Sequence, residues 1–514
     1  MGASRMLCLV LESSTASAKA MLYDLTSGDY RVQIEPYPAM GNNGAQDPDV
    51  VLDALCRVGR MICEDQKDIA FIALSSTWHS TMLCDRDMHP ATPVYQWSYT
   101  GAADICRGLR KDDAFVDRYY RRTGCMVNAA YPYFKLLHLK DRGVDPATHI
   151  VSDQGSYNFH RLTGQFATTE CVASGTGLLD ITLKQFDPEL MDDLDITLDN
   201  LGQLVPYDNS FPLNRTGADL LDLPSGIPVL PANADGGLTQ IGSGALRDGV
   251  MTLSVGTSGA MRLTTPSPLL SPRHDTWCYL APKGWLSGAA TSGACNCVDW
   301  FRNSLSATPS SYRDLENGVH DRENTPVFLP FLSGERCPGW DDERSGGFTG
   351  LKPWHTYQDM YMGVQEGVLF NLFQCYGSIV ELNGEPETVM LSGGILKSAL
   401  WTQMCANIFG RPLVSCHAEQ SSMLGAAMIC SEQAGILSGL EAYRPSTGTV
   451  ITPDTGTSRL YETKFARYLE AYQRSSGEIA LTQAEGTRPS RSASHPPTRV
   501  LSSRPSGDDH SAHR

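Results

Sequence analysis

Residues 231–259 read PANADGGLTQIGSGALRDGVMTLSVGTSG and join the two halves of the chain. An apolar run at 227–230 predicts a strand that brings one carboxylate, Asp235, into a turn of small residues. A second apolar run, 250–255, opens into a Gly-Thr-Ser turn. Phosphoryl transfer needs both features, a group that accepts a hydroxyl proton and backbone amides that hold phosphate oxygens. Taken alone, Asp235 would first be interpreted as a helix N-cap, because Asp before Gly-Gly-Leu is a good helix start.

The length and charge of the chain limit the classes of protein that it can be. At 514 residues it is too long for one ordinary hydrophobic core, so we expect two domains. A formal net charge of −16 argues against a general nucleic-acid binder, which would present a basic surface. The 15 cysteines are scattered and form no CxxC pair, which favours reduced thiols. No segment approaches the ~20 apolar residues of a membrane span, so we expect a soluble, cytoplasmic protein without a membrane partner.

A β-hairpin is predicted at the N-terminus. Residues 7–11 and 18–23 are apolar runs separated by a polar turn, ESSTAS at 12–17. An ordinary hairpin with a hydroxyl-rich tip would explain this pattern by itself. The same order of strand, hydroxyl turn and strand recurs at 251–263, however. Two such hairpins in separate halves indicate a duplicated architecture with phosphate held between the halves.

Two aromatic segments are candidates for contact with a substrate. Residues 68–76 predict a buried strand, and Trp78 and His79 follow its carboxyl end, where open α/β sheets bind their ligands. Local packing of the imidazole is an equally good account of His79. Trp97 has the same ambiguity, because a tryptophan can stack on a sugar face but more often fills a core.

The second half of the chain predicts a further ligand-binding turn. A strand at 388–391 gives way to Gly393 and Gly394, and a helix follows over 398–409 with Ser398 as its N-cap and Gly410 as its stop. A glycine pair between strand and helix lets a base or a phosphate approach the backbone closely.

Three other segments carry structural expectations. Glu335 and Arg336 are adjacent opposite charges in a loop, and we expect them to form a structural ion pair. The small residues 424–427 begin a helix that must pack closely against a neighbour. Residues 485–514, rich in Arg, Ser and Pro, are predicted to be a disordered tail, because they hold almost no apolar surface to bury.

Taken in order, these motifs resemble those of the FGGY carbohydrate kinases, which belong to the actin-like, Hsp70 and sugar-kinase ATPase superfamily. The resemblance extends from residue 7 to about residue 472 and rests on several short motifs in the right order. The first phosphate motif is similar to ESSTASAKAMLYD (12–24), the catalytic-aspartate motif to ADGGLTQIGSGA (234–245), and the second phosphate hairpin to LSVGTSGA (253–260). The further matches are FLPFLSGERCPGWD (328–341), LSGGILKSALWTQMCANIFGRPL (391–413) with SMLGAA (422–427), and YNFHRLTGQFATTECVASGTGLLD (157–180).

The resemblance implies an α/β fold of two RNase H-like (actin-like ATPase) domains, each a mixed sheet flanked by helices, closing over an interdomain cleft. Residues 1–246 would form the N-terminal domain, with the sugar site, the first phosphate hairpin and the catalytic aspartate. Residues 247–475 would form the C-terminal, ATP-binding domain.

The resemblance also implies residue roles. Asp235 would be the base that accepts the proton of the attacking sugar hydroxyl, and with Glu12 it would help to place Mg²⁺. The ATP-binding residues would be Ser14, Thr15, Ser17, Lys19, Gly256, Thr257, Ser258, Gly393, Gly394, Ser398 and Asn407. The substrate-binding residues would be Trp78, His79, Trp97, Tyr131 and Asp235. ATP and Mg²⁺ would be the cofactors and a small sugar or sugar acid the partner, without nucleic acid, and a homodimer is left open.

The chain departs from the family at two positions of the first motif, where Glu12 and Ser14 replace the usual Asp and Gly. These departures motivate an interpretation of another class, a nucleotide-binding sensor that has lost phosphoryl transfer. Among the kinases, the His79-Ser80 pair and the segment 123–125 (TGC) favour gluconate as substrate. Xylulose, or another ketose or polyol, is the alternative. A carboxylate substrate should meet a cation, and the sequence identifies none.

Overall fold

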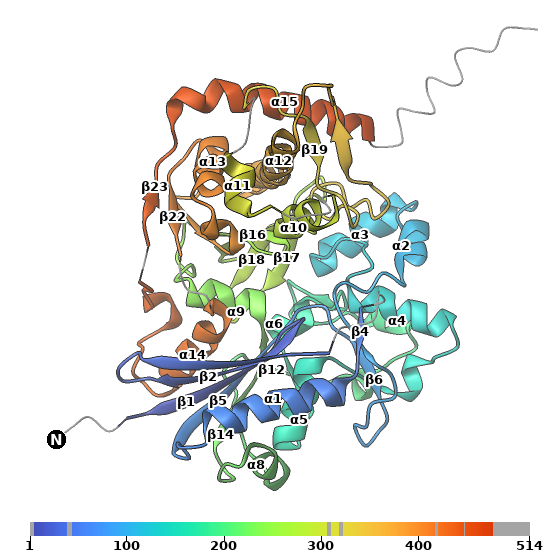
Figure 1. Cartoon of the computed structure of the whole chain (residues 1–514). Coiled ribbons are helices and arrows are strands. Elements are labelled where there is room, and N and C mark those ends of the chain that lie inside the picture. The colour runs from blue at the N-terminus through green and yellow to red at the C-terminus, as the bar shows by residue number, and fades with distance from the viewer. Residues whose placement is uncertain are drawn as a thin grey trace, which may run out of the picture.

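The computed structural model of the protein describes residues 5–38, 44–305, 310–317, 322–416, 420–446 and 448–475. The predicted tail at 485–514 lies outside the described residues. Two mixed β-sheets, each flanked by helices, form two lobes that lie one above the other (Figure 1). The expected fold of two sheet-and-helix domains is confirmed.

The first sheet has the strand order β13-β14-β5-β1-β2-β3. The predicted hairpin is present, since β1 and β2 pair antiparallel around the polar turn. On its other side β1 runs parallel to β5, and β5 runs parallel to β14. The strands are β1 (Leu7–Ser13), β2 (Ser17–Asp24), β3 (Tyr30–Pro36), β5 (Ile69–Ser76), β13 (Phe211–Pro212) and β14 (Pro228–Ala234).

The second sheet has the strand order β17-β18-β16-β15-β21-β22-β23. Its hairpin, β15 with β16, stands beside parallel β21 and β22 just as β1 with β2 stands beside parallel β5 and β14. The predicted duplication of architecture is therefore present. The strands are β15 (Val250–Val255), β16 (Gly259–Thr265), β17 (Trp277–Leu280), β18 (Trp285–Thr291), β21 (Thr388–Ser392), β22 (Leu413–Ser415) and β23 (Val450–Ile451).

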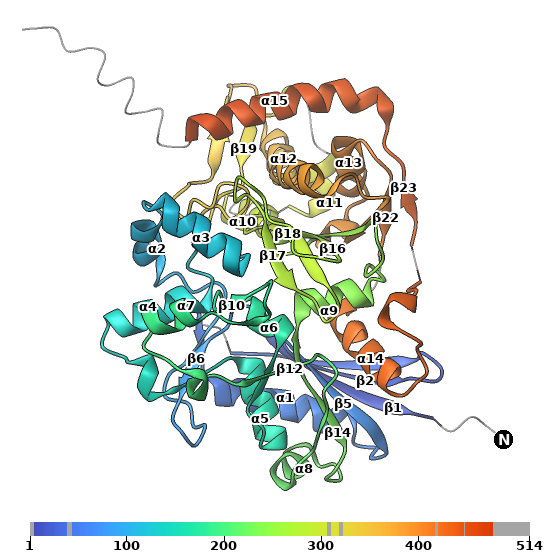
Figure 2. The same cartoon turned by 180° about the vertical axis from the view of Figure 1, so that it is seen from behind.

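Helices cover both sheets. On the first sheet lie α1 (Pro48–Ile62), α5 (Gln154–Thr163) and α8 (Arg215–Leu221), and the second lobe holds α10 (Cys295–Ser304), α11 (Tyr312–Asn317), α12 (Tyr357–Asn383), α13 (Ala399–Phe409) and α15 (Ser458–Ser475). Helices α2 (Ala103–Leu109) and α3 (Asp113–Thr123) precede the second sheet in sequence, yet α3 lies beside β17 and α2 lies on its outer side in both views (Figure 2). A backbone hydrogen bond from Cys278 to Gly124, 2.9 Å long, fixes this contact.

The smaller elements complete the first half and the edges of the second. They are β4 (Ala45–Gln46), β6 (Met82–Cys84), β7 (Val94–Tyr95), α4 (Pro132–Asp141), β8 (Ile150–Ser152), β9 (Ala167–Thr169), α6 (Glu170–Ser174), β10 (Leu179–Asp180), β11 (Gln185–Phe186), α7 (Pro188–Asp193), β12 (Gln203–Val205), β19 (Val327–Leu329) and β20 (Gly347–Thr349).

One helix pair joins the two lobes. Helix α9 (Asp235–Gly242) packs against α14 (Ser421–Gln433), and α14 buries its other side on the first sheet although it comes late in the chain. The two backbones touch, because a Cβ built on Gly425 would lie 2.0 Å from the carbonyl oxygen of Leu238. A Cβ on Gly242 would lie 1.9 Å from that of Ser421. The small-residue helix predicted at 424–427 therefore does pack closely against a neighbour.

The predicted helix at 398–409 is confirmed as α13, with its expected ends. Ser398 is the N-cap and its hydroxyl accepts a hydrogen bond from the Trp401 amide, while Gly410 ends the helix at a φ of 64°. All 15 cysteines are free thiols. Within the described residues, no helix is both long and apolar enough to cross a lipid bilayer.

Candidate active site

Three parallel strands of the first sheet end side by side and bring the first group of candidate residues together. In the register of the sheet, Ser13 at the end of β1 pairs with Ser76 at the end of β5, which pairs with Ala234 at the end of β14. Asp235 comes directly after Ala234, and Trp78 and His79 follow Ser76 by two and three positions. Side chains from distant parts of the sequence therefore meet at one edge, as expected for an open α/β sheet.

Asp235 is the first residue of α9 rather than its N-cap, which is Ala234. Its Oδ1 accepts a hydrogen bond from the amide of Gly236 at 2.7 Å. Burial and then the charge of Glu12 raise the pKa of the Asp235 carboxyl to about 6, while the charge of Arg262 opposes this shift. The carboxylate is therefore ionised at neutral pH but remains a usable proton acceptor.

Glu12 is a buried carboxylate whose two oxygens are both occupied. Its Oε1 pairs with the Nζ of Lys19 at 2.7 Å. Its Oε2 accepts hydrogen bonds from the hydroxyls of Ser75, at 2.9 Å, and Ser422 of α14. Because the hydrogen bonds of Glu12 come from protein groups, we expect it to orient Lys19 and the first hairpin more than to ligate a metal directly.

The turn of the first hairpin contains Ser14 and Thr15, two of the predicted phosphate ligands. The amide and the hydroxyl of Ser14 both bond to the carbonyl of Ser17, at 3.1 and 2.8 Å, so the Ser14 side chain folds back onto its own turn. Thr15 projects at the tip, and its Oγ1 accepts a hydrogen bond from the Nε1 of Trp97 at 3.0 Å. Trp97 thus lies beside the hairpin turn.

His79 lies in the left-handed region with φ of 67°, a conformation that costs energy for a residue with a Cβ and that clusters at functional sites. Its Nδ1 lies 2.6 Å from the carbonyl oxygen of Gly175. Burial, and then the charge of Arg336, lower the pKa of the imidazole to about 3. The ring is therefore neutral, Nδ1 donates its proton to Gly175, and Nε2 is left as an acceptor.

Trp78 and Tyr131 support His79 from behind. The Trp78 Nε1 donates to the carbonyl of Cys171 at 2.8 Å, and a Cβ on Gly236 would lie only 2.4 Å from the indole ring. Tyr131 is fully buried, its hydroxyl lies 2.7 Å from that of Tyr279, and its ring meets the His79 ring edge-on at 5.0 Å. Both residues lie at the site, but their polar atoms are satisfied within the protein.

The second sheet repeats the arrangement on the other lobe. Ser254 of β15 pairs with Ser392 of β21, so the Gly256–Ser258 turn and the Gly393-Gly394 turn leave the same edge. Gly393 has φ of 98°, and a Cβ there would lie 2.4 Å from the carbonyl oxygen of Val255. Only glycine allows this approach. The structure therefore brings Gly256, Thr257, Ser258, Gly393 and Gly394 together.

Ser398 and Asn407 lie further along the same lobe. The Ser398 hydroxyl caps α13 and donates to Glu316 at 2.6 Å. The side-chain oxygen of Asn407 accepts hydrogen bonds from Gln403 at 2.9 Å and from the amide of Asp454 at 2.8 Å. Both side chains therefore have structural partners, and their nucleotide roles stay predictions.

The structure adds two arginines that the sequence did not assign to the site. The positive charges of Arg336 and of Arg262, which lies on β16, lower the pKa of His79. The expected ion pair between Glu335 and Arg336 is wrong, because Glu335 pairs with Arg344 at 2.9 Å. Adjacent residues of an extended loop point apart, which frees Arg336 to face the site. A charged residue inside the apolar β16 strand was the one signal that could have revealed Arg262.

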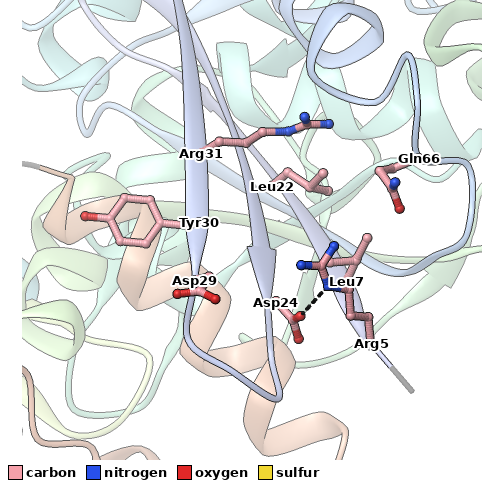
Figure 3. Close-up of a pocket in the computed structure, with 8 residues that line it drawn as sticks. All are labelled: Arg5, Leu7, Leu22, Asp24, Asp29, Tyr30, Arg31 and Gln66. Atoms are coloured by element: carbon pink, nitrogen blue, oxygen red, sulfur yellow. Dashed lines mark ion pairs between the residues drawn. The ribbon is translucent and has the colours of Figure 1, made fainter. Parts of the chain in front are cut away.

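A pocket lies outside this site, at the opposite end of the first sheet, where β1 begins and β2 ends. Figure 3 shows its lining, in which Arg5 pairs with Asp24 at 3.4 Å. The remaining lining residues are Leu7, Leu22, Asp29, Tyr30, Arg31 and Gln66. None of the predicted site residues lies in this pocket.

Comparison with known proteins agrees with the fold. Two family models match the chain, the N-terminal domain of the FGGY family of carbohydrate kinases over residues 7–242 and its C-terminal domain over 251–434. A gluconokinase of Bacillus subtilis is 25% identical over 479 residues, which cover 88% of this chain and 93% of that protein. A xylulose kinase of the same organism is 26% identical over 432 residues, covering 82% and 86%.

Solved structures of carbohydrate kinases are also similar to this chain. The crystal structure of gluconate kinase from Lactobacillus acidophilus is similar with a TM-score of 0.86 and 27% identity, covering 93% of this chain and all of that one. A ligand-bound xylulose kinase from the same organism has the same TM-score, identity and coverage. The two matched domain models together span most of the chain, so this protein belongs to the FGGY family of carbohydrate kinases.

Proposed function

We propose that this carbohydrate kinase transfers the γ-phosphoryl group of ATP to a hydroxyl of a small sugar acid, sugar or polyol, with Asp235 as the catalytic base. The observation that carries the proposal is the position of Asp235, at the strand edge beside His79 and between two hydroxyl-rich hairpins. Phosphoryl transfer depends on such positioning and on charge stabilisation more than on covalent help from the protein.

In this proposal each side chain has one task. Asp235 accepts the proton of the attacking hydroxyl, and its pKa of about 6 suits a base that works near neutral pH. The neutral imidazole of His79 accepts a hydrogen bond from a substrate hydroxyl through Nε2. The hairpin turns around Thr15 and Thr257 hold phosphate oxygens, with Lys19 adding a positive charge.

The chemistry of the donors fits magnesium held mainly by nucleotide phosphates. Among the described residues, only one carboxylate oxygen of Asp235 accepts a hydrogen bond, so the other is available to the ion or to the substrate. Glu12 would not bind the ion directly but would hold Lys19 and Ser75 in place through its hydrogen bonds. Mg²⁺ is usually bound in this manner, by one or two carboxylates together with phosphates, and it neutralises charge on the transferring group.

Gluconate is the first candidate substrate and xylulose the second, because relatives of both names cover most of the chain. We further propose that residues 1–246 and 247–475 act as the two domains of a cytoplasmic enzyme whose cleft closes on its substrates. Closure would exclude water, which competes with the sugar for the phosphoryl group.

The occupied oxygens of Glu12 favour one candidate function of another class, a nucleotide-binding sensor without transfer. One experiment separates the two. ADP release is measured with ATP and Mg²⁺ against gluconate, xylulose, ribulose and glycerol, for the native protein and for Asp235→Asn. We expect one acceptor to stimulate ADP release and Asp235→Asn to lose that stimulation. ATP binding without stimulation by any acceptor would support the sensor instead.

A further inference from the structure

Two arginines on the substrate side of the site, Arg262 and Arg336, have no carboxylate within ion-pair distance among the residues that the structure describes. The Nε atoms of Arg262 and Arg336 are both buried, and neither has a hydrogen-bond partner. Within the described part of the chain, neither side chain forms an ion pair within 4 Å or donates a side-chain hydrogen bond. Burial lowers the pKa of Arg262, with the Asp235 charge opposing, and an arginine stays charged despite such a shift.

Three buried cations of this protein have partners within the chain, whereas Arg262 and Arg336 are half-buried side chains with buried Nε atoms. Lys464 pairs with Glu366 at 2.6 Å, and Arg344 pairs with Glu335 at 2.9 Å. Lys135 is fully buried, and its Nζ donates to the carbonyls of His79 and Gln96 at 2.7 and 2.8 Å. A buried charge without such partners is unfavourable, and two like charges close together are more so. Arg262 and Arg336 are half-buried and their buried Nε atoms lack such partners, which points to an anion supplied from outside the chain.

The fold places both arginines at the acceptor end of the site. Arg262 lies on β16, where its backbone pairs with Gly288 of β18. A Cβ built on Gly236, next to Asp235, would lie 3.1 Å from the Arg262 Nε. Arg336 is carried to the same sheet by the amide of Cys337, which donates to the carbonyl of Ala290 on β18 at 3.0 Å.

The position of Arg262 argues against a role in holding ATP. It lies four residues beyond Ser258 along β16, which at about 3.3 Å per residue is roughly 13 Å from the phosphate turn. The charges of Arg262 and Arg336 act instead on His79 and Tyr279, the groups that surround the acceptor. We therefore infer that the anion bound by Arg262 and Arg336 is part of the acceptor molecule.

We propose that Arg262 and Arg336 bind the carboxylate of the acceptor, so that this enzyme takes a sugar acid of the aldonic type in preference to a neutral ketose or polyol. This inference rests on the proposed function and supplies the cation that a carboxylate substrate requires. Two guanidinium groups offer a planar carboxylate several charge-assisted hydrogen bonds. A neutral acceptor would leave both guanidinium groups without an anion, so the site would favour a sugar acid over its neutral analogue.

The test compares D-gluconate with its neutral amide, which keeps every hydroxyl. Native enzyme, Arg336→Met, Arg262→Met and Arg262→Lys are assayed for kcat/KM with both acceptors at saturating ATP and Mg²⁺. Arg411→Met is the matched control, since Arg411 is an arginine of similar depth that pairs with Glu385 on the far side of the second lobe. Circular dichroism and thermal melting establish that each variant is folded.

We expect the native enzyme to prefer gluconate to its amide by about 10²–10³-fold, the value of one or two charge-assisted contacts. Either methionine variant should remove most of that preference, Arg262→Lys should retain part of it, and Arg411→Met should leave it unchanged. Any effect of Arg262 on Asp235 appears equally with both acceptors, so the ratio isolates carboxylate recognition.

Three outcomes would overturn the inference: equal use of acid and amide, a preference that survives both methionine variants, or a rise in KM for ATP alone. Failure of the proposed function is separable by calorimetry. If no acceptor is phosphorylated but gluconate still binds the native chain and not Arg336→Met, carboxylate recognition stands and transfer does not. If gluconate fails to bind at all, the inference falls.

Discussion

The carboxylate of Glu12 on β1 accepts a hydrogen bond from the hydroxyl of Ser422 on α14, a residue 410 positions later in the chain. This hydrogen bond thus joins the first strand to one of the last helices. The same carboxylate pairs with Lys19 and raises the pKa of Asp235. Glu12 is in this way coupled both to the assembly of the two lobes and to the base.

The first prediction concerns this contact. Glu12→Ala should destabilise the protein by about 2–4 kcal/mol, because it removes one partner of a buried ion pair and leaves Lys19 and Ser75 unsatisfied. Ser422→Ala, which deletes a single hydrogen bond to a charged group, should cost about 1–2 kcal/mol. Urea denaturation of both variants checks the order. Equal stability of Glu12→Ala and the native protein would contradict the importance of the pair.

The second prediction is the pH dependence of catalysis. A base with a pKa of about 6 must be ionised to act, so kcat/KM should fall about tenfold per pH unit below pH 6 and level off above it. Glu12→Gln removes a negative charge that raises this pKa, so the acid limb should move to lower pH. A profile measured from pH 5 to 8 with both proteins tests this. An acid limb that moves upward would exclude the assigned interaction.

The third prediction separates stability from activity at Asp235. The pKa of Asp235 in the folded protein, about 6, lies above the ordinary aspartate value of 3.8, so its ionisation disfavours the folded state. Stability from this group is fully present below pH 3.8 and is lost as the pH rises through 6. At pH 7.5 the free energy of unfolding of Asp235→Asn should therefore exceed that of the native protein by about 1–2 kcal/mol, and the variant should unfold at a higher temperature. Transfer should drop by about 10²–10⁴-fold.

Comparing the melting temperatures at pH 7.5 and pH 5 supplies the control for Asp235→Asn. The advantage of the variant should shrink as the pH falls, because the native carboxyl becomes protonated and neutral. A constant advantage at both values would mean that the gain has another origin.

The fourth prediction concerns the close contact of α9 with α14. Gly425→Ala would place a Cβ 2.0 Å from the Leu238 carbonyl oxygen and so must push the helices apart. We expect a loss of about 2–4 kcal/mol, together with lower activity because α9 begins with Asp235. Gly377→Ala on α12 is the matched control, since nothing lies within 4 Å of its Cβ. That variant should gain up to about 1 kcal/mol from helix propensity, and chemical denaturation measures both.

Much of the local structure followed from short-range patterns. The alternation around 12–17 and 251–263 predicted both hairpins, and Ser398 and Gly410 marked the ends of α13 because capping depends on neighbouring residues alone. Asp235 was predicted to be the base because it lies between two hydroxyl-rich hairpins and upstream of a Gly-Gly turn, whereas taken alone it would be interpreted as a helix N-cap. The pairing of Glu335 was predicted wrongly, because the nearest opposite charge in sequence was not the nearest in space.

The sequence by itself determined the two hairpins, the Gly-Gly turn and the position of Asp235 after a buried strand, since each is written in residues that adjoin one another. Only the tertiary structure decided that Trp97 lies against Thr15, that Ser422 reaches Glu12, and that the charges of Arg262 and Arg336 act on His79. These relationships depend on which surfaces the packed lobes bring together. They also depend on the loss of water around the charges, and neither effect has a local sequence signature.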